Sequence, residues 1–339
     1  MKLSPNFSHI YIEENAIPYK WTQHILTRFP KAAVIHISDY KEVFTRSGQN
    51  FRLQKESMKL ILAVKKDRFL YPGSPNAQNF GLTNFYYNAL ILNCLYDCTY
   101  CYLQGMYTSG NPLLFVNLED YFTATSQALH RREDPYSPLY LAISYDTDLL
   151  AFESIIPYCR EWVQFARNTP ELLIEIRTKS ANFGSIRDLE PTDQVVLAWT
   201  LSPSIVTRTY EKGAPPLLHR LEAAKRAIDN GWQVRLCFDP VLRTENWLEH
   251  YSACIEETFK VIAANSIHDV TIGGFRVSAD HFKEMRSVRH DSALLYYPYK
   301  RKGNIVSYSE NENSEINKFM IEKLKMYIPK DRIAAWTSL

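Results

Sequence analysis

From about residue 88 onward, short apolar runs alternate with longer amphipathic stretches. The apolar runs predict strands over residues 88–92, 139–145, 172–178, 195–201, 233–238 and 270–275. The stretches between or after them predict helices over residues 118–131, 153–167, 217–229, 247–264 and 279–286, with a short turn near 183–189. Strands that alternate with helices are typical of repeated βα units around a parallel sheet. The pattern therefore predicts an α/β fold with six such units.

The two flanking segments show different patterns. Residues 1–87 contain strand-like runs at 10–12 and 59–64 and a helical stretch at 21–29, which predicts a small N-terminal α/β cap. Residues 291–339 contain two short strands around the Gly303–Asn304 turn and a final helix over 316–327. We therefore expect a cap (1–87), a barrel-like domain (88–290) and a C-terminal hairpin with a helix (291–339).

Alternation within the predicted strands separates two faces. Ile174 and Ile176 should face the helices, since helix-facing positions of such a sheet are large and apolar. The opposite face then carries polar side chains that end near one rim, where parallel barrels place their active sites. These lumen rows are Glu175, Arg177 and Lys179; Val196, Ala198, Thr200 and Ser202; and Arg235, Cys237 and Asp239.

Three cysteines, Cys94, Cys98 and Cys101, follow the first of these strands in the spacing C-x3-C-x2-C. Iron–sulfur clusters are bound through cysteine sulfur, so three thiolates can hold three irons of a 4Fe-4S cluster and leave the fourth open. A structural zinc site is the alternative, but it needs four ligands, usually in pairs. The other cysteines stand alone, and a chain of 339 residues needs no disulfide framework. The spacing favours an iron–sulfur cluster.

Composition and charge indicate where the protein is located but do not identify a binding partner. The formal net charge of +2 neither indicates nor excludes a nucleic acid, so any basic surface must be local. No apolar run approaches the roughly 18–20 residues needed to cross a membrane, and no signal segment is recognisable. We expect a cytoplasmic monomer that does not bind membranes. One local basic group exists at the predicted hairpin tip, where Tyr299, Lys300, Arg301 and Lys302 could grip phosphates or simply form a solvated edge.

The cysteine spacing resembles the signature of the radical S-adenosylmethionine (SAM) enzymes. In that superfamily SAM chelates the open iron and is cleaved to a 5′-deoxyadenosyl radical. The six βα units that begin just before the cysteines match its partial (β/α)6 TIM-like barrel. The resemblance implies a 4Fe-4S cluster and SAM as cofactors.

Within that superfamily the chain resembles the spore photoproduct lyase family. The cysteine segment, residues 98–104, is close to that family's C-x-Y-C-Y-L-Q. Other matches follow in order over most of the chain: residues 12–19, 177–179, 210–213, 220–224, 231–232 and 239–241. The family reverses a thymine dimer, spore photoproduct, in ultraviolet-damaged DNA. The resemblance therefore implies a carbon–carbon lyase that acts on double-stranded DNA, with an electron donor such as flavodoxin or ferredoxin.

The resemblance also implies roles for single residues. Cys94, Cys98 and Cys101 would bind the cluster, and Tyr102 matches a tyrosine linked to hydrogen return. Tyr299 and Lys300, with Arg301 beside them, fall near a lesion-binding pair on the family's hairpin. The positions that match the SAM site are Tyr100, Thr147, Lys179, Thr200 and Ser202.

One departure concerns the hydrogen donor. Most of the family carries a cysteine after the second strand, in the frame S-C-x-S-D, whereas this chain has Tyr145 there. A tyrosine can pass a hydrogen atom, although its O–H bond differs in strength from a thiol S–H. Cys237 is another candidate donor, although a lone buried cysteine is more often a small core residue. Two alternatives therefore stay open: a radical SAM enzyme for another substrate, and a non-catalytic iron–sulfur protein that binds nucleic acid.

Overall fold

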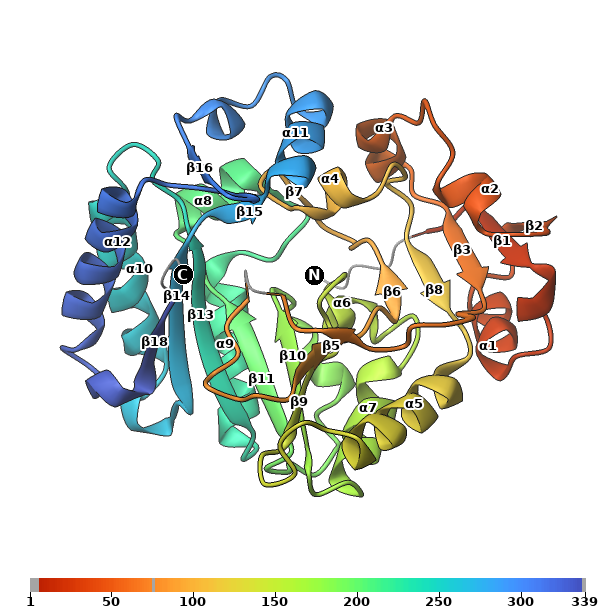
Figure 1. Cartoon of the computed structure of the whole chain (residues 1–339), viewed down its shortest axis with the longest axis horizontal. Coiled ribbons are helices and arrows are strands. Elements are labelled where there is room, and N and C mark those ends of the chain that lie inside the picture. The colour runs from red at the N-terminus through yellow and green to blue at the C-terminus, as the bar shows by residue number, and fades with distance from the viewer. Residues whose placement is uncertain (1–5, 75–76, 337–339) are drawn as a thin grey trace.

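The computed structural model describes residues 6–74 and 77–336. Its largest sheet has eight strands and curls around an interior cavity, with helices on the outside (Figure 1). All neighbouring strands are parallel except the β4–β5 pair. In spatial order the strands are β18 (Ile333–Ala335), β14 (Asp269–Gly274), β13 (Gln233–Val241), β11 (Val195–Thr200), β10 (Leu172–Thr178), β9 (Leu139–Ala142), β5 (Phe85–Tyr87) and β4 (Tyr71–Pro72). The predicted α/β half-barrel is confirmed.

The outer helices pack through one apolar face. In α9 (Leu217–Asp229) the small residues Ala223, Ala224 and Ala227 are fully buried, so this helix approaches the sheet closely. The others follow the same rule of buried positions three or four residues apart: α5 (Leu118–His130), α7 (Tyr158–Arg167), α10 (Trp247–Val261) and α12 (Glu310–Leu324). Strand β10 and helix α9 have the predicted bounds. The helix predicted over 153–167 begins only after Pro157, as α7, and a separate short helix, α6 (Leu149–Phe152), precedes the predicted range.

A second sheet of five strands stands beside the barrel. Its order is β2 (Ala33–Ile37), β1 (His9–Glu13), β3 (Leu60–Ala63), β8 (Leu113–Phe115) and β6 (Ile91–Leu92). The N-terminal helices α1 (Lys20–Arg28), α2 (Lys41–Phe44) and α3 (Phe51–Glu56) accompany it. Strands β6 and β8 lie beyond residue 87, so this sheet does not end at the expected boundary of the cap. The division into three parts stays a prediction.

The strand predicted over 88–92 was assigned to the wrong sheet. The barrel position belongs to β5, and the N–H of Asn88, directly after β5, donates to the Ala142 carbonyl of β9 at 3.3 Å. The chain then crosses to β6, which pairs antiparallel with β8. Residues 89–92 are all buried, so their apolar pattern is the same whichever sheet receives them.

The C-terminal hairpin is confirmed by β16 (Lys300–Lys302) and β17 (Ile305–Ser307). A third strand, β15 (Arg276–Ser278), which the sequence pattern did not predict, pairs with β17 and leads into α11 (Ala279–Val288). Helix α11 packs on the short helix α4 (Leu103–Met106) that follows the third clustered cysteine. Among the described residues, no helix is long and apolar enough to span a membrane.

The contact between α4 and α11 depends on a glycine. A Cβ at Gly105 would lie 2.1 Å from the backbone oxygen of His281, whereas a Cβ at Gly184 would meet nothing within 4 Å. We expect Gly105→Ala to destabilise the protein by about 1–3 kcal/mol, because the two helices must separate. Gly184→Ala is the matched control and should leave stability unchanged or slightly higher. Chemical denaturation of both variants measures the difference; equal midpoints would contradict the close approach.

Candidate active site

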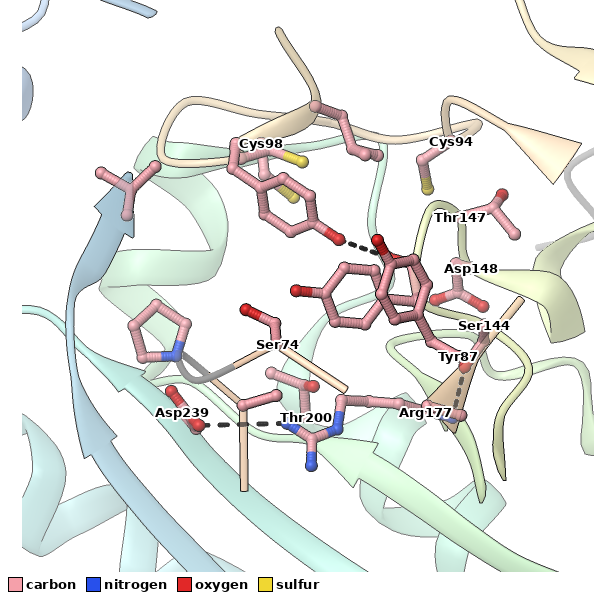
Figure 2. Close-up of a pocket in the computed structure, with 18 of the residues that line it drawn as sticks. Ser74, Tyr87, Cys94, Cys98, Ser144, Thr147, Asp148, Arg177, Thr200 and Asp239 are labelled. Carbon is pink, nitrogen blue, oxygen red and sulfur yellow. Dashed lines mark hydrogen bonds and ion pairs between the residues drawn. The ribbon is translucent and has the colours of Figure 1, made fainter. Parts of the chain in front are cut away.

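A cavity of about 440 Å³ opens at the carboxyl ends of the barrel strands. Figure 2 shows Cys94 and Cys98 at one end of it and Arg177 and Asp239 at the opposite end, and Cys101 also lines the cavity. Side chains from the ends of β9, β10 and β11 form the wall between them, which is where the lumen rows were predicted to converge.

The cysteine loop begins directly after β6. Cys98 lies in the two-residue strand β7 (Asp97–Cys98), and the Cys101 N–H donates to the Cys98 carbonyl at 3.1 Å. Burial raises the pKa of all three thiols, that of Cys94 to about 11. Two lysine charges lower these pKa values in part. The charge of Lys55, whose ammonium donates to the Cys94 carbonyl, favours the Cys94 thiolate, and the charge of Lys179 favours the Cys98 thiolate. The loop is thus partly buried, sulfur-rich and flanked by cations.

The donor set fits an iron–sulfur cluster better than a single ion. Among residues 6–74 and 77–336, no three His, Cys, Asp or Glu side chains are grouped so that they could hold one metal ion. A structural zinc site requires such a convergence on one centre. In a 4Fe-4S cluster each thiolate binds a different iron, so the sulfurs need only face a shared space, and all three line the same cavity.

The carboxylate of Glu211 joins the cysteine loop to the barrel. It lies in β12 (Glu211–Lys212), which pairs with β7 so that Glu211 is opposite Cys98. Its side chain accepts hydrogen bonds from the Tyr100 hydroxyl, from Ser202 Oγ at 2.9 Å and from Arg220. Both members of the Glu211–Arg220 ion pair have no exposed side-chain surface. Burial acts to raise the pKa of Glu211, but the charges of Arg220 and Lys179 outweigh it and bring that pKa to about 2. The group therefore stays ionised.

A second buried carboxylate, Asp148, orders the other wall. It accepts hydrogen bonds from Thr178 Oγ1 and from the Lys179 N–H, both at 2.6 Å, and it caps α6 through the Ala151 N–H at 3.1 Å. This bonding turns the end of β10 toward the cavity. The neighbouring Thr147 Oγ1 is buried without a hydrogen-bond partner among the described residues, as expected of a group that awaits a ligand.

Four of the five residues matched to the SAM site line this cavity together: Tyr100, Thr147, Lys179 and Thr200. The Lys179 ammonium lies 5.4 Å from the centre of the Tyr100 ring. Ser202 is not among the lining residues. It is buried behind the wall, where its hydroxyl donates to Glu211.

Of the three residues predicted to transfer hydrogen, two line the cavity and one does not. Tyr102 and Tyr145 both line the cavity, and the Tyr102 hydroxyl donates to the Tyr145 carbonyl at 2.5 Å. The Tyr145 ring stacks on Tyr87 with centroids 4.2 Å apart. Cys237 is fully buried and does not line the cavity, since its strand neighbours Thr200 and Thr271 enclose it.

The hairpin residues lie outside the cavity. Lys300 and Arg301 are exposed, and Arg301 donates to the Gly303 carbonyl at 2.9 Å. Tyr299 packs among aromatic rings, with Phe275 and Tyr308 at 4.9 and 5.1 Å. The structure thus does not bring Tyr299, Lys300 or Arg301 to the cysteines.

Several lining residues had no signal in the sequence. Tyr87, Arg276 and His281 reach the cavity from β5, β15 and α11, segments whose lumen faces the pattern did not identify. The pair Glu211 and Arg220 belonged to matched motifs, but their partnership only becomes visible through the fold.

A curled parallel sheet with three cysteines on a loop at the carboxyl ends of its strands is the architecture of the radical SAM proteins, and the cavity beside the thiols agrees with it. The family model described as spore photoproduct lyase matches residues 5–337. The chain therefore belongs to the spore photoproduct lyase family.

Individual relatives are distant but aligned over most of their length. The chain is 21% identical to the spore photoproduct lyase of Bacillus subtilis over 77% of this chain and 75% of that one. It is 19% identical to the Geobacillus enzyme over 97% and 98% of the two chains. A solved spore photoproduct lyase complexed with dinucleoside spore photoproduct superposes with a TM-score of 0.82 at 18% identity, covering 98% and 99%. A mutant of such a lyase with bound AdoMet and the same dinucleoside gives 0.81 at 18% identity, again covering 98% and 99%.

We expect Glu211→Gln to reduce cluster loading, because the amide leaves the Arg220 charge buried without its partner and loosens Tyr100. Breaking a buried pair in this way costs about 3–5 kcal/mol. Glu222→Gln, on the exposed side of α9, is the control. Iron and sulfide content after anaerobic reconstitution, together with thermal unfolding, measure the effect. A Glu211→Gln protein that matches its control in both would show that the ion pair does not hold the loop.

Proposed function

We propose that this protein is a radical SAM lyase that reverses spore photoproduct in DNA. The observation that carries the proposal is one cavity that the three cysteines and Tyr145, the candidate hydrogen donor, line together. Membership of the spore photoproduct lyase family and the shared fold support it.

The residues at the two ends of the cavity have different proposed roles. Cys94, Cys98 and Cys101 would hold a 4Fe-4S cluster, and Tyr100, Thr147, Lys179 and Thr200 surround the space beside it. The cluster with SAM supplies, when bound, the radical that starts the reaction. The protein's own part is to limit the access of water, since Cys98 and Tyr100 are buried and Cys94 and Cys101 are partly buried, and to orient the lesion between the two ends.

Tyr145 is the proposed hydrogen source for the product thymine. Its side chain lines the cavity, burial raises its pKa, and its ring stacks on Tyr87. The hydroxyl therefore keeps its hydrogen at neutral pH. Tyr102 supports this arrangement by donating its own hydrogen bond to the Tyr145 backbone.

The decisive assay is anaerobic. Reconstituted, reduced protein receives SAM and an oligonucleotide with spore photoproduct, and chromatography follows 5′-deoxyadenosine and thymine. We expect thymine to appear in the wild type and to fall about 10²-fold or more in Tyr145→Phe, since removing a positioned hydrogen donor costs about that much. Cys237→Ala, which changes a buried residue outside the cavity lining, should retain activity. Full activity of Tyr145→Phe, or its loss in Cys237→Ala, would contradict this assignment.

Double-stranded DNA is the proposed partner, with the exposed basic tip of the β16–β17 hairpin as its contact. We expect the triple reversal Lys300→Glu, Arg301→Glu and Lys302→Glu to weaken DNA binding about tenfold or more and to lower its salt dependence, because phosphate contacts release counterions. The control is Lys318→Glu, Lys325→Glu and Lys330→Glu, three exposed lysines on and after α12. Fluorescence anisotropy at several salt concentrations measures both. Equal effects of the two sets would reject the hairpin as the contact.

A radical SAM enzyme for a different substrate is the second candidate. The tyrosine in place of the family's cysteine favours it, because a changed hydrogen donor suits a changed product radical. In the same assay it would give 5′-deoxyadenosine without thymine, whereas a non-catalytic iron–sulfur protein would give neither. As electron donor we propose a flavodoxin or ferredoxin, and as setting the cytoplasm, with the protein a monomer.

A further inference from the structure

The end of the cavity opposite the cysteines presents one guanidinium and one carboxylate side by side. Arg177 donates from Nε to Glu175 at 3.0 Å, and its Nη1 lies 3.9 Å from Asp239 Oδ2. Its side chain is 31% exposed, compared with 5% for Glu175 and 7% for Asp239. Figure 2 shows the Arg177 side chain extending across this end of the cavity toward Asp239. The remaining N–H groups of the guanidinium form no hydrogen bond with the residues that the structure describes.

The surrounding ion pairs leave this end nearly neutral. Asp239 accepts two bonds from Arg276, at 2.7 and 2.9 Å. Glu175 accepts from Arg235 at 2.5 Å and from the Tyr140 hydroxyl at 2.7 Å. Asp269, which does not line the cavity, accepts two further hydrogen bonds from Arg235. Three carboxylates thus alternate with three guanidiniums, and a ligand here gains little by bringing a charge of its own.

The same geometry disfavours a phosphate. An anion at Arg177 would lie next to the Asp239 carboxylate, and like charges repel strongly where water is excluded. A neutral group with an acceptor beside a donor has no such penalty. Its acceptor would take a free N–H of Arg177, and its donor would use a second lone pair of Asp239.

The imide of thymine has this pattern, since the C4 carbonyl accepts and the adjacent N3–H donates. The location also suits a thymine of the lesion. Tyr145, Arg177 and Asp239 all line this cavity, so the pair and the proposed hydrogen donor share it. The backbone of Arg177 is itself fixed, because its N–H donates to Ser144 Oγ at 2.7 Å.

We propose that Arg177 and Asp239 bind the imide edge of one thymine of the lesion, Arg177 as donor to the C4 carbonyl and Asp239 as acceptor of the N3–H. This inference deepens the proposed lyase function and rests on it. It assigns Arg276 and Glu175 a positioning part, since they hold the pair in place.

The test compares two substrates with two variants. The substrates are the dinucleoside spore photoproduct and its N3-methylated analogue, which cannot donate from N3. The variants are Asp239→Asn and the milder Arg177→Lys, which keeps the charge beside Glu175. Binding of each substrate to the reconstituted holoenzyme without SAM is measured by calorimetry, and kcat and KM for thymine release are measured anaerobically. The surface changes Arg187→Gln and Asp193→Asn are matched controls.

We expect both variants to bind the natural lesion about 10- to 100-fold more weakly than the wild type, as for loss of a hydrogen bond to a charged group. The N3-methyl analogue should bind the wild type and Asp239→Asn equally, because that bond is already absent. SAM affinity should not change in either variant. A folded Arg177→Lys protein keeps the inference testable if Asp239→Asn proves unstable.

Two binding results would overturn the inference. Weaker SAM binding in the variants would assign the pair to SAM. A loss that is equal for both substrates would show that the N3–H is not read. The proposed lyase function is tested by a different result: it is wrong if the wild type releases no thymine. A wild type that is active, with variants equal to the surface controls, rejects only the imide contact.

Discussion

The buried charge of Glu211 is the interaction on which the rest of the site depends. An ionised carboxylate without exposed surface is costly unless every lone pair is used. Glu211 meets this condition with Arg220, Tyr100 and Ser202, which come from the helix after it, from the cysteine loop and from the end of β11. The cysteine loop, with few residues of regular structure of its own, is thereby tied to the barrel. Loss of any one partner leaves an unsatisfied buried group, so the loop, the strand end and α9 are held as a unit.

The cavity is organised by the direction of its strands. Parallel strands bring all their carboxyl ends to one rim, so polar side chains from distant parts of the chain meet there. The thiols and their flanking lysines occupy one end, and the alternating arginines and carboxylates occupy the other, with tyrosines between them. Both ends are partly shielded from water, which strengthens each hydrogen bond and penalises each unpaired charge. A radical reaction needs such a space, because water and loose side chains are alternative hydrogen donors.

Much of this was accessible from the sequence for specific reasons. Strand β10 and helix α9 have clear periods and clear ends, and they appear with the predicted bounds. Arg177 faces the cavity because alternation with Ile174 and Ile176 leaves it no other side. Ser202 obeys the same alternation yet turns to Glu211, since β11 already ends at Thr200 and the chain no longer follows the pleat. The strand over 88–92 went to the neighbouring sheet because a fully buried apolar run has no polar face to mark its partner.

The sequence by itself determined the class of fold, the cysteine loop and the side of each strand that carries polar residues, because periodicity and spacing are local properties. Only the tertiary structure decided which of those residues meet. Tyr100 and Glu211 are 111 positions apart, and Arg276 reaches Asp239 from 37 positions away. The periodicity of a strand or helix predicts which face a side chain lies on, but it does not predict which residue lies across the cavity from that side chain. The pairing of Arg177 with Asp239, the isolation of Cys237 and the distance of the basic hairpin from the thiols all follow from how the sheet curls, which no local pattern records.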